Sequence, residues 1–155
     1  MIILGIDPGF DRMGWAILEK KLGKEKLISS GCLITKRSLL YGERIFGLGQ
    51  ELEKIIKCFK PDIVAVEQLF FFKNQKTALK VSEARGMVLY IVASKNISVY
   101  ELTPLQIKMA LTGYGRAEKQ QVQKMVMNIL KLKKKPKYDD EIDAIACAMS
   151  CPAKL

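Results

Sequence analysis

The stretch Ile2-Ile3-Leu4-Gly5-Ile6-Asp7-Pro8-Gly9 opens the chain and decides the fold. Its short apolar run predicts a strand buried on both faces, since a half-solvated strand would alternate apolar and polar residues. Asp-Pro-Gly is a turn signal that ends this strand. An acidic residue therefore stands at the end of a buried central strand, which is where open α/β sheets place their sites.

Further strands are expected along the chain. Residues 15–18 and 27–34 are typical of two strands, with Gly23-Lys24 between them as a hairpin turn. Residues 62–67 (Asp-Ile-Val-Ala-Val-Glu) predict another buried strand, and residues 97–100 a short one. Three strands therefore open the chain as a meander, and the later strands alternate with helical segments.

Helical periodicity begins at Tyr41, where apolar residues recur at helical spacing as far as Phe59, and Pro61 marks the end of that helix. Further helices are expected over residues 74–95, 103–111, 118–131 and 140–150. The order of elements predicts a mixed sheet covered by helices. No repeat, linker or low-complexity region interrupts residues 1–155, so we expect a single domain.

The charge of the chain indicates a polyanionic partner. Its 155 residues carry 26 Lys+Arg against 16 Asp+Glu, a formal net charge of +10. Such proteins bind phosphate backbones with a gain in free energy from the release of counterions. The alternative is that the positive charge serves only the solubility of the protein. Residues 101–137 contain nine Lys or Arg and two acids, and four acids follow at Asp139, Asp140, Glu141 and Asp143. A basic segment beside an acidic cluster suits a phosphate-handling metal site, whereas either run alone is usually a solvated loop.

Several classes of protein are excluded by the composition. The chain has no histidine, and its four cysteines form no Cys-x-x-Cys pair, which excludes Cys₂His₂ zinc fingers. We expect reduced, mostly buried thiols in a cytoplasmic protein. Residues 1–6 are too short for a signal peptide, and no apolar stretch approaches the roughly 18 residues that span a membrane.

Four carboxylates are candidates for chemistry. Asp7 and Glu67 end two strands, and they converge if those strands are neighbours. Asp140 and Asp143 are three apart and share one face of a helix, although Asp139 could share that face with Asp143. Converging carboxylates repel one another, and hard oxygen ligands suit Mg²⁺ or Mn²⁺. Alternatively, Asp7 only organises its turn, and Asp139 caps a helix N-terminus.

Five blocks carry a resemblance to a known family: residues 3–9, 65–68, 84–86, 117–122 and 140–146. In this order and spacing, they resemble the RuvC family of crossover (Holliday) junction endodeoxyribonucleases over about residues 1–150. The resemblance implies an RNase H-like α/β fold, a five-stranded mixed sheet flanked by helices. It also implies a homodimer that cuts four-way DNA junctions by symmetric paired nicks in homologous recombination and DNA repair.

The resemblance also implies the residues of the site. The four acidic metal ligands of the family match Asp7, Glu67, Asp140 and Asp143, and two Mg²⁺ ions, replaceable by Mn²⁺, would bind them. A gapless count favours Asp139 as the third ligand, whereas the Asp-x-x-Asp spacing favours Asp140. Hydrolysis would leave 5′-phosphate and 3′-hydroxyl ends.

DNA-binding residues follow from the same resemblance. An aromatic residue in the loop after Glu67 stacks on bases in the family, and Phe70 matches it. At least one of the three Phe residues could be ordinary core, which we expect of Phe71 or Phe72. Lys108 and Lys119 match basic residues that contact DNA in the family, and Lys76, Lys80 and Arg85 are expected to extend the groove, unless these residues form solvated helix faces. The helix over 74–95 is the expected dimer interface, through Leu79, Val81, Met87, Leu89 and Val92. A branch-migration helicase complex is the expected further partner.

Three other functions compete with this interpretation. Actin-like sugar kinases also open with Gly-Ile-Asp-x-Gly, but they need a second nucleotide-binding half. An RNase H-like nuclease acting on RNA or RNA–DNA hybrid would share the fold and the metals. A DNA-binding module that has lost catalysis is disfavoured because all four acids have candidates.

Overall fold

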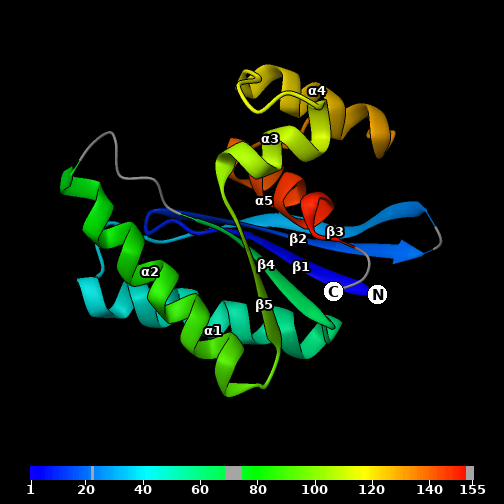
Figure 1. Cartoon of the computed structure of the whole chain (residues 1–155). Coiled ribbons are helices and arrows are strands. Elements are labelled where there is room, and N and C mark those ends of the chain that lie inside the picture. The colour runs from blue at the N-terminus through cyan, green and yellow to red at the C-terminus, as the bar shows by residue number, and fades with distance from the viewer. Residues whose placement is uncertain (22, 69–74, 153–155) are drawn as a thin grey trace.

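The computed structural model describes residues 1–21, 23–68 and 75–152, and its centre is a five-stranded mixed sheet (Figure 1). The strands are β1 (Ile2–Asp7), β2 (Arg12–Lys21), β3 (Lys24–Ile34), β4 (Ile63–Glu67) and β5 (Ser98–Leu102). They lie in the order β3-β2-β1-β4-β5. β1 pairs antiparallel with β2 and parallel with β4, so the apolar opening run is the central strand, as predicted.

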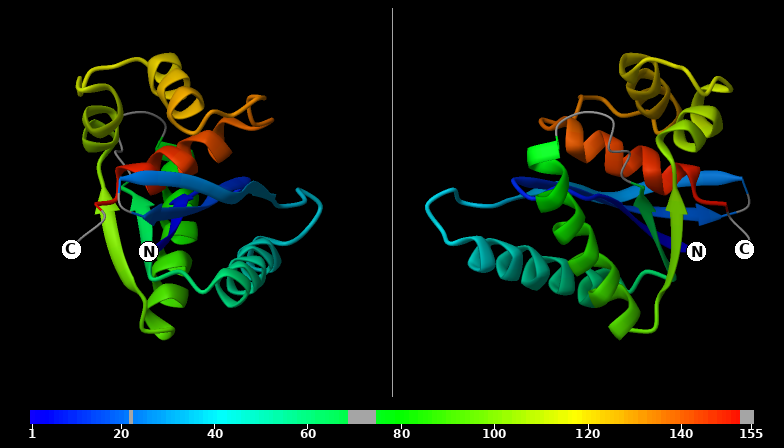
Figure 2. Two further views of the ribbon diagram at one scale, coloured as in Figure 1. Left: turned by 90° about the vertical axis from the view of Figure 1, so that its right-hand side faces the viewer. Right: turned by 60° about the vertical axis from the view of Figure 1, so that its left-hand side comes forward.

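Helices cover both faces of this sheet (Figure 2). They are α1 (Tyr41–Phe59), α2 (Gln75–Ser94), α3 (Pro104–Thr112), α4 (Lys119–Ile129) and α5 (Asp139–Ser150). α1 and α2 pack on one face, and α5 packs on the other with α3 and α4 beside it. Every helix end lies within two residues of the sequence prediction.

Because helices cover both faces of the sheet, β1 is almost entirely apolar. Successive side chains of a strand point to opposite faces. Ile3 therefore enters the core beneath α5, whereas Leu4 and Ile6 enter the core beneath α1 and α2. All three side chains are fully buried. A strand with a core on each face has no solvated position, which is why the run shows no polar alternation.

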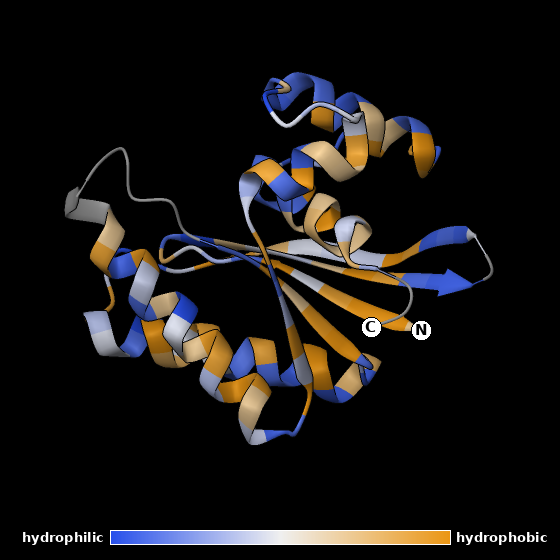
Figure 3. Ribbon diagram, viewed as in Figure 1, coloured by the Kyte–Doolittle hydropathy of each residue, from blue (hydrophilic) through white to orange (hydrophobic). Residues whose placement is uncertain are grey.

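The β2–β3 hairpin is longer than predicted. β2 extends three residues beyond the predicted 15–18 at each end, and β3 begins at Lys24, which was predicted to belong to the turn. The extra residues at the hairpin tip are mostly charged (blue in Figure 3). They pair with each other across the hairpin and include few apolar side chains, so hydrophobic periodicity does not reveal them.

The four cysteines are free, as expected. Cys147 and Cys151 are buried in or beside α5, but Cys32 is half-buried and Cys58 is exposed. The prediction of mostly buried thiols is therefore correct for only two of them, because Cys58 lies on the solvent side of α1. Within the described ranges, no helix is both long and apolar enough to cross a membrane.

Two glycines allow α5 to lie directly on the sheet. A Cβ atom at Gly5 of β1 would come within 2.2 Å of the Ala144 carbonyl oxygen. A Cβ atom at Gly14 of β2 would come within 1.8 Å of the Asp140 carbonyl oxygen. Both obstacles are helix backbone, which cannot move without moving the helix. The position of the first turn of α5 therefore depends on the missing side chain of Gly14.

We expect Gly14→Ala to lower the free energy of unfolding by about 1–3 kcal/mol, because the methyl group must push α5 away from the sheet. The measurement is urea denaturation. Gly47→Ala in α1 is the matched control, since nothing lies within 4 Å of a Cβ atom there. That substitution should be neutral or stabilise by about 0.5–1 kcal/mol. Equal stability of the two variants would contradict the close contact.

Candidate active site

The carboxylates of Asp7 and Glu67 lie at the ends of two adjacent parallel strands. Ile6 pairs with Val66 in the β1–β4 register, so the next residues along both strands are neighbours. The residues four positions before each acid lie in the core beneath α5. Because side chains alternate along a strand, both carboxylates face α5.

Helix α5 brings two further acids to the same place. Asp140 and Asp143 lie in its first turns, three residues apart on one face. The helix start is fixed by its contact with Gly14 and by Ser30 of β3, whose Oγ donates a hydrogen bond of 2.6 Å to Glu141 Oε1. The sheet therefore fixes the backbone that carries both acids.

The pKa values show that these four acids influence one another. Burial raises the pKa of Asp7 well above its ordinary value, and the other three acids raise it further, in the order Glu67, Asp143, Asp140. Burial raises the pKa of Glu67 to about 7, and the charge of Asp143 adds to the effect. Burial also raises the pKa of Asp143, against the opposing hydrogen bond from Lys119. Asp7 is the centre of the group.

Asp140 and its neighbour Asp139 have different surroundings. Asp139 is exposed, and the bond from Lys135 Nζ, 3.2 Å away, is the main cause that lowers its pKa. Asp140 faces the other acids and contributes to the raised pKa of Asp7. Asp139 is the first residue of α5, and Tyr138 occupies the N-cap position without a side-chain cap, so the alternative of Asp139 as a helix cap is wrong.

Two lysines border the acids. Lys119 Nζ donates a hydrogen bond of 2.7 Å to Asp143 Oδ2. Lys108 and Lys119 line a cavity of about 260 Å³ together with Glu67 and Asp143. Lys108 lies on α3, which is capped by Thr103, whose Oγ1 accepts from the Gln106 backbone N–H, and Lys119 is the first residue of α4. An anion entering this cavity would meet two ammonium groups beside the carboxylates.

The other predicted DNA-binding residues are distributed differently. Lys80 is exposed on α2, and its ammonium lies 5.6 Å from the ring of Phe10. Arg85 forms an ion pair with Glu101 of β5, so its guanidinium already has an anionic partner. Phe70, and the alternatives at 71 and 72, lie outside the described residues, as does the side chain of Lys76.

Sequence reasoning missed Arg12. Its Nε lies 3.1 Å from Asp140 Oδ2, and its guanidinium lies 5.6 Å from the ring of Tyr138. Arg12 begins β2 beside the acid-bearing end of β1, where Asp7 pairs with Gly14. The signal was present, since an antiparallel hairpin after Asp-Pro-Gly returns this residue to the acids. It was overlooked because the strand was predicted to begin at residue 15.

Carboxylate oxygens are suitable ligands for a hard divalent cation, but in this structure the acids are too far apart to coordinate one together. Asp140 Oδ2 is buried without a hydrogen-bond partner, since the N–H of Arg12 is not aligned with it. Four carboxylates with one unpaired oxygen are a chemical match for Mg²⁺ or Mn²⁺. Among the described residues, however, no three acids stand close enough to hold a metal ion. Arg12 pairs with Asp140, and Lys119 pairs with Asp143.

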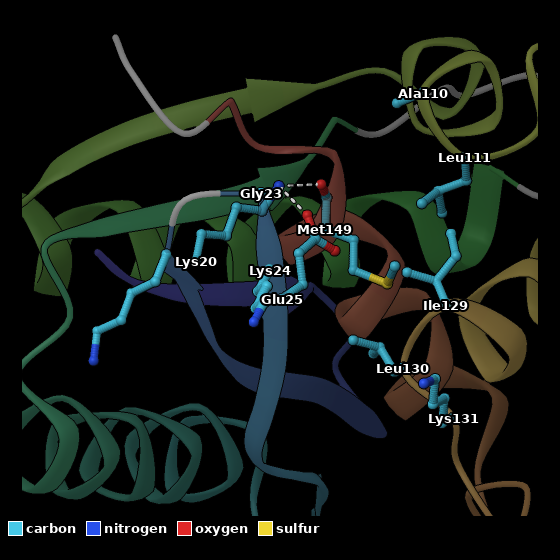
Figure 4. A pocket seen from close by; sticks show the side chains of 11 residues that line it. Lys20, Gly23, Lys24, Glu25, Ala110, Leu111, Ile129, Leu130, Lys131 and Met149 are labelled. Atoms are coloured by element: carbon cyan, nitrogen blue, oxygen red, sulfur yellow. Dashed lines mark hydrogen bonds and ion pairs between the residues drawn. The ribbon is translucent and has the colours of Figure 1, made fainter.

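A larger cavity, of about 670 Å³, lies at the other end of the sheet, near the start of β1 (Figure 4). Lys20 donates from its wall to the carbonyl oxygens of Met149 and Cys151, at 2.5 and 2.8 Å. It also pairs with Glu25 at 2.7 Å. Lys20 therefore satisfies the free carbonyls at the C-terminus of α5. Among its described lining residues Glu25 is the single acid, so they do not reproduce the carboxylate group around Asp7.

Comparison with known proteins agrees with this geometry. The family model described as "Crossover junction endodeoxyribonuclease RuvC" matches residues 3–151. The RuvC of Petrotoga mobilis is 48% identical over 148 residues, covering 96% of this chain and 91% of that protein. The RuvC of Caldicellulosiruptor saccharolyticus is 49% identical over 150 residues, covering 96% and 90%. The structure of Thermus thermophilus RuvC in complex with Holliday junction substrate superposes with a TM-score of 0.91 at 34% identity, covering 97% and 92%.

The sheet order and the acids at the ends of β1 and β4 define an RNase H-like nuclease fold, as predicted. A likeness in fold alone extends to the yeast mitochondrial Holliday junction resolvase Ydc2, with a TM-score of 0.68 at 14% identity. The chain belongs to the RuvC family of crossover junction endodeoxyribonucleases. It is an endonuclease, and the family resemblance predicted from the five sequence blocks is confirmed.

The raised pKa of Glu67 predicts a pH-dependent stability in chelator. The pKa of Glu67 is about 7 in the folded protein, above the ordinary 4.5. Its contribution to the free energy of unfolding is therefore complete below pH 4.5 and is lost as the pH rises through 7. Glu67→Gln has no ionisable group at this position and does not undergo this loss. Above pH 7 we expect the variant to be more stable than the parent by about 1–3 kcal/mol, with little difference at pH 4.

Urea denaturation in chelator at pH 4, 6 and 8 measures this difference. Glu51→Gln is the control, because Glu51 lies exposed on α1 beside Lys54 and has no acidic neighbour in the site. A difference between Glu67→Gln and the parent that stays constant from pH 4 to pH 8 would show that Glu67 is not buried among like charges.

Proposed function

We propose that the chain cuts four-way (Holliday) DNA junctions by metal-dependent hydrolysis, in homologous recombination and DNA repair. The observation that carries this proposal is the gathering of acids from β1, β4 and α5 around Asp7, with Lys108 and Lys119 at their edge. Such a site suits a substrate that is itself an anion. The T. thermophilus relative, with which the chain shares its fold along nearly its whole length, binds a Holliday junction.

The four carboxylates would hold two Mg²⁺ ions, and Mn²⁺ would substitute. Asp7 is central among the acids and would hold the ions together with Glu67, Asp140 and Asp143. Divalent ions there would lower the pKa of the attacking water and offset charge on the leaving oxygen. The described acids have to close in by side-chain rotation, since α5 is fixed on the sheet by Gly14.

The remaining residues position the DNA. Lys119 is bonded to Asp143 and faces the same cavity as Lys108, so the two would hold the scissile phosphate against the acids. The chain contains no histidine that could serve as a base. Attack in line with the 3′ oxygen would release that oxygen and leave 5′-phosphate and 3′-hydroxyl ends.

A wider DNA surface would extend from this cavity. Lys80 is exposed on α2, and we propose it as a backbone contact together with Lys76. Phe70 would stack on a base near the junction centre, where stacking is worth about 1–3 kcal/mol per base. Arg85 stays a predicted DNA contact, although its present partner is Glu101. Binding of a polyanion by this surface should weaken with salt.

Junction cleavage tests the function and the ligand set together. In Mg²⁺, the protein should place paired symmetric nicks in a synthetic four-way junction with a mobile core, and should spare linear duplex and RNA–DNA hybrid. Asp7→Asn and Asp140→Asn should each lower the cleavage rate by at least about 1000-fold, because a metal ligand is lost. Asp139→Asn is the matched control and should cut within about three-fold of the parent rate.

The possible results separate the alternatives. Cleavage of hybrid in place of the junction would move the function to RNase H-like processing with the same site. Junction binding without cleavage in Mg²⁺ or Mn²⁺ would leave a binding module. If Asp139→Asn lost activity and Asp140→Asn kept it, the third ligand would be Asp139.

We also propose that the protein works as a homodimer through the outer face of α2. Within the predicted set, Val92 is buried and Met87 packs on the core, so these two are not available to a partner. The exposed stripe is Leu79, Glu83, Gly86 and Tyr90, at helical spacing. Leu79 and Tyr90 are 72% and 75% exposed, and Gly86 has open space where a Cβ atom would lie. Two such helices could cross closely at Gly86.

Tyr90→Glu should convert the dimer to a monomer, because a carboxylate at this position would be buried against the partner helix. Sedimentation velocity at micromolar concentration measures the change. Phe46→Glu on α1 is the control, since Phe46 is similarly exposed at 64% and lies on another helix. A parent protein that is already monomeric would contradict the dimer, and dissociation by both variants would contradict its placement on α2.

A branch-migration helicase complex remains the further partner that the family resemblance implies, and a cytoplasmic location remains a prediction. The α2 stripe and the acid cavity are assigned to a second copy and to DNA, so any helicase contact should lie elsewhere.

A further inference from the structure

A second cavity borders the acids on the side away from Lys119. It has a volume of about 440 Å³, and its wall includes Gly9, Arg12, Lys80 and Asp140. Glu67 and Asp143 line the first cavity, whereas Asp140 lines the second. Asp7 is influenced by the charges of all three. The acids thus stand between two cavities. Among the described residues, each cavity is lined by two cationic side chains, and Asp11 also lines the second one.

Arg12 is only partly engaged by its neighbours. Its side chain is 49% exposed, and the one ion pair that it forms with a described residue is with Asp140, 3.1 Å from Nε, since Asp11 in the same cavity pairs with Arg44. The contact is an ion pair without the alignment of a hydrogen bond, and Asp140 Oδ2 stays unsatisfied. A guanidinium has five N–H donors in a planar fork that matches a phosphate. Its donors therefore remain available to a second anion in the same cavity.

The turn that presents Arg12 is fixed. A Cβ atom at Gly9 would lie 1.9 Å from the Arg12 carbonyl oxygen, so the chain folds back tightly only because residue 9 is glycine. Arg44 of α1, nearly buried, donates to Thr35 Oγ1 from Nε at 2.9 Å and forms an ion pair with Asp11. Its guanidinium also lies 4.0 Å from the ring of Phe10. The backbone at Arg12 therefore does not need to be ordered by DNA.

We propose that this second cavity binds a phosphate of the cut strand adjacent to the scissile one, and that Arg12 exchanges Asp140 for that phosphate. The proposal rests on the proposed function. In the metal-free protein Arg12 offsets the charge of Asp140. A divalent ion that takes Asp140 leaves the guanidinium beside a second cation, and a phosphate in the cavity relieves that repulsion. Lys80, on α2, supplies the other cationic group of the cavity.

The exchange predicts opposite effects of Arg12→Gln on two ligands. Arg12 competes with a metal ion for Asp140, so its loss should tighten the binding of Mn²⁺ alone. A residue with a merely structural role would weaken metal binding when it is lost. On DNA, the loss of one phosphate contact should lower the salt dependence of junction binding by about 0.9 in slope. This second effect should appear only when a metal occupies the acids.

The first experiment titrates Mn²⁺ into the full chain without DNA and measures free Mn²⁺ by electron paramagnetic resonance. Arg12→Gln should bind Mn²⁺ about two- to five-fold more tightly than the parent, as expected for a half-exposed ion pair. Arg12→Lys should restore the parent affinity to within about two-fold. Lys54→Gln, which removes a positive charge on the outer face of α1, is the control and should change nothing. Unchanged or weaker Mn²⁺ binding by Arg12→Gln would overturn the exchange.

The second experiment measures junction binding by fluorescence anisotropy over a range of salt, once in Ca²⁺ and once in chelator, with intact junction verified on denaturing gels. Arg12→Gln should lower the slope in Ca²⁺ and leave it unchanged in chelator. Lys80 is proposed to contact DNA without exchanging a partner. Lys80→Gln should therefore lower the slope both in Ca²⁺ and in chelator. An equal decrease for Arg12→Gln in both conditions, or none in Ca²⁺, would overturn the proposal. Failure of the parent protein to prefer the junction would instead count against the proposed function, and the Mn²⁺ result does not depend on it.

Discussion

Helix α5 lies so close to the sheet that two of its carbonyl oxygens occupy the positions where side chains of β1 and β2 would begin. Gly5 and Gly14 make this possible, and the rest of the site depends on it. Asp7 and Glu67 are placed by strand pairing, but Asp140 and Asp143 reach them only because no side chain separates helix from sheet. Helices normally pack against sheets through intervening side chains, and a gap of that size would carry the second pair of acids away from the first.

The same closeness creates an electrostatic cost that the fold must offset. Acids that surround a buried carboxylate raise its pKa, so the site resists full ionisation without cations. In the described structure the cations are Lys119 at Asp143 and Arg12 at Asp140. These side chains offset part of the negative charge of the site. Each of them pairs with one acid of the group, and the carboxylate keeps its second oxygen free of that pair. The same cations would compete with a metal ion for those two acids.

Much of this arrangement could be predicted from the sequence, and the reasons are local. The apolar run before Asp7 indicates a central strand because only a strand covered twice lacks polar alternation. Pro61 indicates the end of the helix that begins at Tyr41, and in the structure α1 ends at Phe59. Asp140 could be preferred over Asp139 from the Asp-x-x-Asp spacing, and the structure places it toward Asp7. Their role as metal ligands is a separate matter, and it stays a prediction.

What escaped prediction depends on contacts between distant segments. Arg12 and Asp140 are far apart in sequence, and their pairing requires both the β1–β2 turn and the seating of α5. The start of β2 is Arg12-Met13-Gly14, and one apolar residue between an arginine and a glycine does not mark a strand, so Arg12 was overlooked. The role of Arg44 could not be predicted either. It is a charged residue on the inner side of α1, and its partners Asp11 and Thr35 come beside it only in the folded chain. Glycines and arginines of this kind fix the turn and the helix rigidly. Movement at the site is then left to side chains, and a ligand can exchange partners there without disturbing the sheet.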